Sequence, residues 1–178
     1  GAIKRANITQ DSDSFKRNLN IYVISEDSSG NLVETNSALK GNLKNWIKRY
    51  KMINDTVDIL NTYIVNIGIE FTAVASPGVN KFDVSQAAIS FLARNLTVNK
   101  REIGERFFIT DIYSILDAVP GLLDVVDVKV NKKSGAQYSS TPLFLDELTD
   151  PDGRYIDTPE NVILEIKFPN ADIKGTIL

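Results

Sequence analysis

The fold is decided by residues 43–130, which contain three patterned segments in a fixed order. The patterns predict a basic amphipathic helix at residues 43–51 (LKNWIKRYK), a long strand at 62–74 (TYIVNIGIEFTAV) and a returning strand at 119–130 (VPGLLDVVDVKV). In the helix the apolar residues recur every three or four positions, and in the long strand apolar and polar residues alternate. Two shorter amphipathic helices are expected between the two strands. This order predicts a small α+β unit.

The number of helices between strands predicts the direction in which each strand runs. A first strand is expected around Leu19, Ile21 and Val23, which alternate with polar or amphipathic neighbours. One helix, capped by Thr35 or Asn36, separates it from the long strand, so these two strands should be parallel. Two helices then return the chain antiparallel. We therefore expect a mixed β-sheet with three amphipathic helices on one face and a β-α-β-α-α-β core.

The chain is predicted to have three regions. Residues 1–17 are polar and lack periodicity, which is typical of a linker or a disordered terminus. The α+β domain is expected at residues 18–132. Residues 133–178 are predicted to form an acidic loop followed by a β-rich C-terminal extension. Because the chain begins Gly-Ala-Ile-Lys without Met, we expect it to be a piece of a longer protein.

Four residues are predicted to determine the shape of the core. Gly68 interrupts a strand that is long for a small domain, so a bend or bulge is expected there. Thr110 is expected to cap the third helix. Pro120 cannot continue that helix, and Gly121 supplies a permissive exit from it.

Composition excludes several kinds of chemistry. The 178 residues include no Cys and no His, which removes disulfides, thiolate nucleophiles, Cys-based zinc sites and the commonest general base. No run approaches the ~18 apolar residues of a membrane helix. The net charge of −3 gives no reason to expect nucleic acid. We therefore expect no enzymatic activity, no metal or other cofactor, and no membrane or nucleic-acid partner.

The acidic turn near residue 150 invites a calcium hypothesis. An EF-hand-like loop with Gly153 at its sixth position would place Leu148 first and Pro159 twelfth. Neither side chain contains an oxygen that could bind calcium, so the register fails. A β-turn at residues 150–153 (DPDG) is the better interpretation.

Charge is distributed unevenly along the chain. Residues 38–51 carry five bases and no acid, whereas residues 143–178 carry eight acids and three bases. We expect the acidic tail, or its counterpart in a partner, to dock near the basic helix. The candidate interface residues are Lys40, Lys44, Lys48, Arg49, Lys132, Lys133 and Tyr138. The apolar face of the helix is predicted to contain Leu39, Leu43, Trp46, Ile47 and Tyr50. Because its aromatic residues lie on that face and not among the lysines, a stacking surface for nucleic acid is disfavoured.

Two segments, residues 43–74 and 99–130, resemble the baseplate wedge proteins of T-even-like contractile-tailed phages. The likeness covers most of residues 36–132. In the second segment the residues that match the broader baseplate J-like pattern are Gly104, Thr110-Asp111-Ile112 and Val119-Pro120-Gly121. Many proteins of this kind end soon after the returning strand, whereas this chain continues for ~45 residues, a third or more of a typical domain.

The resemblance implies the C-terminal portion of a large structural subunit of the virion tail baseplate, assembled in the host cytoplasm. Such subunits associate in pairs and bind other wedge proteins. We therefore expect a homodimer or higher assembly, formed through a self-complementary surface and pairing of β-edges. The alternative is a regulatory α+β module that binds a small ligand, and a metabolite that raised the Tm would favour it.

Overall fold

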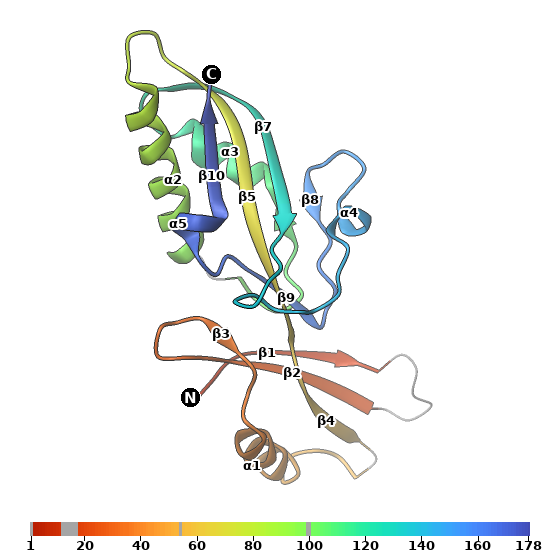
Figure 1. The fold of residues 1–178 in the computed structure, drawn as a ribbon. Coiled ribbons are helices and arrows are strands. Elements are labelled where there is room, and N and C mark those ends of the chain that lie inside the picture. Colours follow the sequence, from red (N-terminus) through yellow and green to blue (C-terminus); the bar gives the residue numbers. More distant parts are fainter. Residues whose placement is uncertain (1, 12–17, 54, 99–100) are drawn as a thin grey trace. The chain divides into compact units, whose positions relative to one another are not determined.

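The computed structural model describes residues 2–11, 18–53, 55–98 and 101–178. Within these ranges the chain forms five helices and ten strands in mixed sheets, which confirms the α+β fold class. The chain divides into two compact units instead of the three predicted regions (Figure 1). The first unit consists of Gly1–Ile64, Glu102–Glu105 and Pro159–Ile163, and the second of Val65–Arg101, Arg106–Thr158 and Leu164–Leu178.

The first unit is built around a four-stranded mixed sheet. Its elements are β1 (Ile3–Gln10), β2 (Asn18–Glu26), β3 (Leu32–Val33), α1 (Ser37–Ile47) and β4 (Thr56–Asn61). β1 pairs antiparallel with one edge of β2, and β3 and β4 pair with the other edge, antiparallel and parallel respectively. The helix between β2 and β4 therefore leads to a parallel strand, but that strand is β4 and not the long strand at residues 62–74 that was predicted to be parallel to the first; the long strand belongs to a different sheet.

The strand β1 contradicts the linker predicted for residues 1–17, of which residues 1 and 12–17 lie outside the described part. Alternate residues of β1 are half-buried. Three of these are polar (Arg5, Asn7 and Thr9): the Arg5 guanidinium lies 3.4 Å from the Glu26 carboxylate, and the Asn7 amide donates to the carbonyl of Glu160 at 2.9 Å. Because polar side chains occupy inward positions, the alternation of β1 is hidden in the sequence.

Three distant parts of the chain supply the apolar core of the first unit. Ile24, Ile103 and Ile163 pack together in it. Beside them Gly104 has a φ of +74°, and a Cβ placed there would lie 2.9 Å from the Cα of Glu160. Both the left-handed backbone and the close approach require glycine, which explains the residue at this position.

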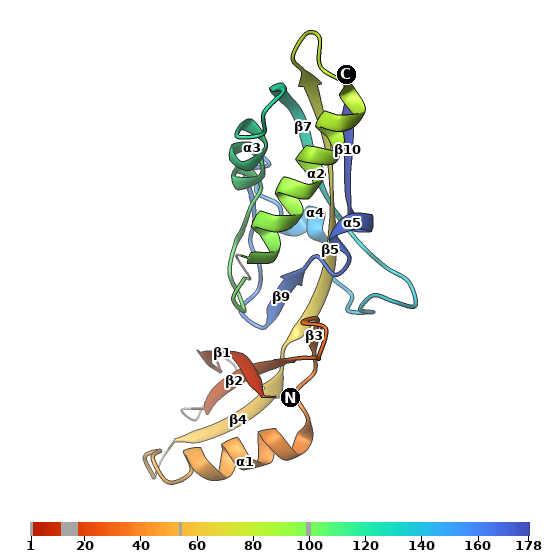
Figure 2. The same cartoon turned by 90° about the vertical axis from the view of Figure 1, so that its left-hand side faces the viewer.

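The second unit is built around a sheet in which β5 is central. Its elements are β5 (Tyr63–Ala75, which starts in the first unit), α2 (Lys81–Val98), β6 (Phe107–Phe108), α3 (Ile109–Asp117), β7 (Leu122–Lys132), α4 (Leu145–Leu148), β8 (Tyr155–Ile156), β9 (Val162–Glu165, which also starts in the first unit), α5 (Pro169–Asp172) and β10 (Ile173–Ile177). The sheet order is β10-β5-β7, with β9 also paired to β5. α2 packs against β10, α3 against β7, and the two helices pack against each other (Figure 2).

The predicted alternation of β5 holds only in its second half: Phe71 and Ala73 are buried on either side of the half-buried Thr72, and Glu70 is exposed, whereas Val65 to Ile69 are all buried and Tyr63 is 55% exposed. The returning strand β7 is antiparallel to β5, as predicted, but its own alternation is interrupted. The pairing shifts register between Thr72 and Ala73 of β5, so Val125 is buried whereas Val126 is 55% exposed. This β-bulge turns one apolar side chain of β7 toward solvent.

Most of the C-terminal extension is an integral part of the second unit, whereas its residues Pro159–Ile163 belong to the first. Its last strand, β10, pairs parallel with the centre of β5 and places Gly175 opposite Phe71. A Cβ at position 175 would lie 2.3 Å from Cζ of Phe71, whose ring is buried. Glycine therefore leaves the space that the Phe71 ring fills over the edge strand.

Gly68 does not produce the bulge that the sequence predicted. The pairing of β5 with β7 continues without a shift from Ile67 to Thr72. Instead, a Cβ at Gly68 would lie 2.8 Å from the carbonyl oxygen of Asp172 and 2.0 Å from Cε of Lys133. The glycine is needed for close approach: it lets other segments lie directly over the strand.

The predicted loop after β7 is held on the second unit by a polar network. Asn66 is 1% exposed; its amide donates to the Glu165 carboxylate at 2.8 Å and its oxygen accepts from the Ser139 N–H at 2.7 Å. The Tyr138 hydroxyl donates to the buried Asp172 at 2.6 Å. This hydrogen bond to Asp172 raises the pKa of Tyr138 above its usual value.

The end of α3 agrees with the prediction, but its start does not. The helix begins at Ile109, and Thr110 lies in its first turn and is not the cap. The N–H groups of Ile109 and Thr110 donate to the carbonyl of Arg154 at 2.8 and 3.3 Å, so a backbone carbonyl replaces the side-chain cap. The helix ends before Pro120, and Gly121 follows with a φ of +91°.

Candidate interaction surface

The basic helix α1 is started by Asn36, one of the two caps predicted. The Asn36 side chain accepts from the N–H of Ala38 at 2.8 Å. After Ile47 the N–H groups of Tyr50 and Lys51 both donate to its carbonyl, at 2.9 and 3.0 Å. These bonds continue the turn and keep the residues after the helix close to its last turn.

The apolar face of α1 is narrower than predicted. Leu39, Leu43 and Ile47 are half-buried, and no residue of α1 is fully buried. Trp46 and Tyr50 were predicted on the same packed face, but they are 58% and 71% exposed. The prediction is wrong for these two residues because α1 packs chiefly against β4, and one strand covers only a narrow stripe of a helix.

Four large side chains are therefore left in solvent at the end of α1. We call Trp46, Tyr50, Met52 and Ile53 the α1 knuckle. The rings of Trp46 and Tyr50 lie 4.8 Å apart, and Met52 and Ile53 are 73% and 100% exposed. Scattered single apolar residues are normal on a surface, whereas a contacting aromatic pair followed within three residues by two further exposed apolar side chains indicates an interaction site. Trp and Tyr are also enriched among the residues that dominate binding energy at protein interfaces.

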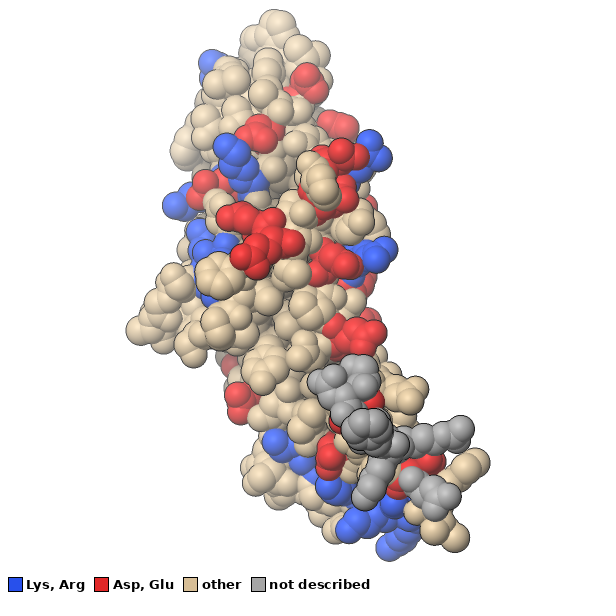
Figure 3. Space-filling view, turned by 90° about the vertical axis from the view of Figure 1, so that its right-hand side faces the viewer, with Lys and Arg blue, Asp and Glu red and all other residues tan. Residues whose placement is uncertain are grey.

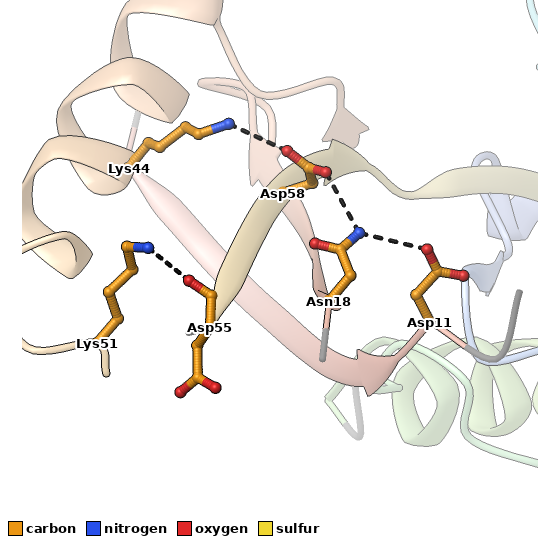
Figure 4. Close-up of polar contacts among 6 residues, drawn as sticks. All are labelled: Asp11, Asn18, Lys44, Lys51, Asp55 and Asp58. Carbon is orange, nitrogen blue, oxygen red and sulfur yellow. Dashed lines mark hydrogen bonds and ion pairs between the residues drawn. The ribbon is translucent and has the colours of Figure 1, made fainter. Parts of the chain in front are cut away.

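Three of the five cations in residues 40–51 are bonded within the first unit, and Figure 4 shows two of them, Lys44 and Lys51. Lys40 donates to the Asn61 side chain at 3.0 Å, Lys44 to the Asp58 carboxylate at 3.0 Å, and Lys51 to the backbone carbonyl of Asp55. The other oxygen of Asp58 lies 3.4 Å from the Asn18 amide. The lysine face predicted as an interface is thus partly used to attach α1 to β4.

The Lys44–Asp58 contact is expected to make a small, pH-dependent contribution to stability. The hydrogen bond from Lys44 lowers the pKa of Asp58 below 3.8, with a further contribution from Asn18. A lowered carboxyl pKa stabilises the fold at pH values above the unfolded pKa, and this stabilisation is lost as pH falls through the folded pKa. Both side chains are about half exposed, so Asp58→Asn should cost less than about 1 kcal/mol at neutral pH.

Urea unfolding of the wild type and Asp58→Asn measures this difference. The two proteins should differ at neutral pH and converge as the pH falls below 3.8, the ordinary carboxyl pKa. A difference that stayed constant across this range would mean that Asp58 acts through packing and not through its charge.

Lys48 and Arg49 remain available for a partner. Both are exposed, and within the part of the chain that the structure describes neither side chain has a hydrogen-bond or ion-pair partner. They lie between Trp46 and Tyr50 in the sequence. The α1 knuckle is therefore flanked by two adjacent free cations.

The other predicted interface residues belong to the second unit, whereas the basic helix belongs to the first. Lys132 donates to the carbonyl of Thr141 at 2.6 Å, Lys133 crosses over Gly68, and Tyr138 bonds Asp172. The polar groups of Lys132 and Tyr138 hold the loop after β7 in place.

The acidic turn of the second unit is a β-turn, as predicted. The N–H of Gly153 donates to the carbonyl of Asp150 at 2.7 Å, and Gly153 has a φ of +68°. Among the described residues no group of three or more acidic side chains is placed to hold a metal ion. Nearby, the Asp157 carboxylate lies 2.8 Å from Arg106, whose pKa is raised by that hydrogen bond.

A second exposed group lies at α4, and we call it the α4 patch: Phe144, Asp146 and Glu147. Phe144 is 72% exposed, and both carboxylates are exposed. Neither carboxylate has a side-chain partner among the residues described. Acidic side chains gather over the face of the second unit that contains α4 and β8 (Figure 3).

Sequence reasoning missed the α1 knuckle and the α4 patch. The run WIKRYKMI (residues 46–53) places Met52 outside the periodic stripe, and that mismatch was the available signal. In the α4 patch, Phe144 lies between Leu143 and Leu145 in a short apolar run that ends at two acids. Such a run is too short to show from sequence which of its side chains face the core and which face the surface.

No helix among the described residues is long and apolar enough to cross a membrane. No protein-family model matches the chain, and no curated protein sequence matches it either.

Proposed function

We propose that the chain is a structural component of a contractile phage tail baseplate wedge that mediates subunit association and wedge assembly. The observation that carries this proposal is the α1 knuckle. Its four large apolar side chains are 58–100% exposed and are flanked by Lys48 and Arg49, whose side chains have no partner among the described residues. An aromatic centre with a polar, charged rim is the composition of a protein–protein interface. The resemblance of residues 43–74 and 99–130 to wedge proteins supplies the biological setting.

Side-chain docking is a better mechanism for this association than strand pairing at β7. Among the described residues β7 pairs only with β5, so its other edge is open to strand addition. However, the N–H of Val128 donates to the Tyr113 hydroxyl of α3 at 3.1 Å. This bond occupies a backbone group that an added strand would need. The α1 knuckle has no such obstruction.

Co-expression with the proteins encoded beside its gene tests the proposal. We expect a complex with one or more of these proteins, or concentration-dependent self-association in sedimentation velocity. A chain that stays monomeric, forms no complex and gains a higher Tm from a metabolite would contradict the proposal and favour the ligand-binding module.

A further inference from the structure

We propose that the α1 knuckle of one copy docks on the α4 patch of a second copy, so that Lys48 and Arg49 meet Asp146 and Glu147. This inference rests on the proposed assembly function. It adds the identity of the partner, which is another copy of the same chain, and the two surfaces that meet.

The two surfaces have matching compositions and opposite charges. On the knuckle, two adjacent cations without a partner among the described residues lie beside the exposed Trp46 and Tyr50. On α4, the adjacent carboxylates of Asp146 and Glu147 also have no side-chain partner among the described residues, and they follow the exposed Phe144 in the sequence. Each surface thus offers an aromatic anchor with a pair of free charges next to it. Because one pair is positive and the other negative, the two surfaces are electrostatically complementary between copies.

Most other acids near the C-terminus are already engaged. Asp152 pairs with Arg154 at 3.7 Å, Asp157 with Arg106 at 2.8 Å, Glu165 with Asn66 at 2.8 Å, and Asp172 with Tyr138 at 2.6 Å. The excess negative charge of residues 143–178 is therefore available mainly at α4. This singles out Asp146 and Glu147 as the partners for the basic helix.

The chemistry of the contact combines three interactions. Phe144 can pack against the rings of Trp46 and Tyr50, which adds an aromatic pair to the buried apolar area. The Arg49 guanidinium can form a bidentate bond with a carboxylate, which fixes the orientation. The ion pairs are partly screened at the rim, so association should weaken as salt concentration rises.

The contact joins two different surfaces of the chain. Each copy has one knuckle and one α4 patch, so two copies can dock reciprocally across a two-fold axis, or copies can add head to tail into rings or filaments. In either arrangement a copy that lacks one surface can dock only through the other, and this property gives the proposal its test.

The test mixes two variants, each of which lacks the charges of one surface. Lys48→Gln with Arg49→Gln removes the basic pair, and Asp146→Asn with Glu147→Gln removes the acidic pair. All four positions are exposed, so both variants should fold. Each variant alone should associate at least about thirtyfold more weakly than the wild type in sedimentation velocity. Mixed together, they should form a complex of one copy of each that grows no further.

The outcomes separate this inference from the proposed function. The α4 patch is not the partner if the wild type associates but the mixture forms no one-to-one complex. The same conclusion follows if the variant that lacks the acidic pair associates like the wild type. If the wild type neither self-associates nor binds a tail protein, both proposals fail. Glu160→Gln and Lys81→Gln, which change exposed charges outside the two surfaces, are the matched controls and should leave association unchanged.

Discussion

Replacing Trp46 and Tyr50 together by serine should weaken association of the chain by at least about a hundredfold. Aromatic anchors at interface centres typically contribute about 2 kcal/mol or more each, which is about thirtyfold in the dissociation constant. Both side chains are more than half exposed, so they contribute little to the packing of the first unit. The substitution should therefore leave the Tm nearly unchanged while association is lost.

Sedimentation velocity of the variant and the wild type across a range of concentrations measures this effect. Phe82→Ser is the matched control, because Phe82 is a similarly exposed aromatic residue (69%) on α2 of the second unit. It should associate like the wild type. If the Phe82 variant lost association as strongly as the knuckle variant, general surface hydrophobicity would explain the result and the knuckle would have no special role.

Replacing Gly175 by alanine should destabilise the second unit by about 1–3 kcal/mol, the usual cost of overpacking a core. The added methyl group would lie 2.3 Å from Cζ of Phe71 and 2.9 Å from two other ring atoms. The ring is 2% exposed, so it has no free space into which it can move. Relief requires a shift of β10 away from β5, which weakens the pairing between them.

Two comparisons isolate this clash in urea unfolding. Gly41 of α1 has no atom within 4 Å of its Cβ position, so Gly41→Ala should instead stabilise the first unit by about 0.5–1 kcal/mol through helix propensity. In a Phe71→Leu background, Gly175→Ala should cost much less than in the wild type, because the ring that it meets is gone. Equal costs in the two backgrounds would show that the strain lies elsewhere.

Local patterns predicted individual elements well. The existence of β5, a helix cap at Thr35 or Asn36 and the stop at Pro120 and Gly121 were all readable, because each depends on neighbouring residues. The division of the chain into two units could not be predicted from such local patterns. Residues 56–75 form one uninterrupted β-pattern, but Thr62 separates β4 from β5. The Thr62 N–H and hydroxyl both bond the carbonyl of Val23, at 3.2 and 3.3 Å. Nothing in the sequence marks this long-range contact.

The candidate site was only half predictable for a related reason. Periodicity placed Leu43, Trp46 and Tyr50 on one side of a helix, but it cannot say how wide a surface will cover that side. The covering surface is chiefly one strand, so the stripe that packs is narrow and the aromatic residues at its margin are exposed. Gly68 shows the same difficulty: the sequence marked a special position in β5, but only the tertiary structure shows that close approach is the cause.

The central claim, that the α1 knuckle is covered when copies associate, can be measured with the intrinsic fluorescence of the wild type. Trp46 is the only tryptophan in the chain, and it is 58% exposed in the single copy. As concentration rises, its emission maximum should move to shorter wavelength and acrylamide should quench it less, in step with the sedimentation coefficient. Association without any change in Trp46 emission or quenching would contradict the claim, because the copies would then meet through another surface.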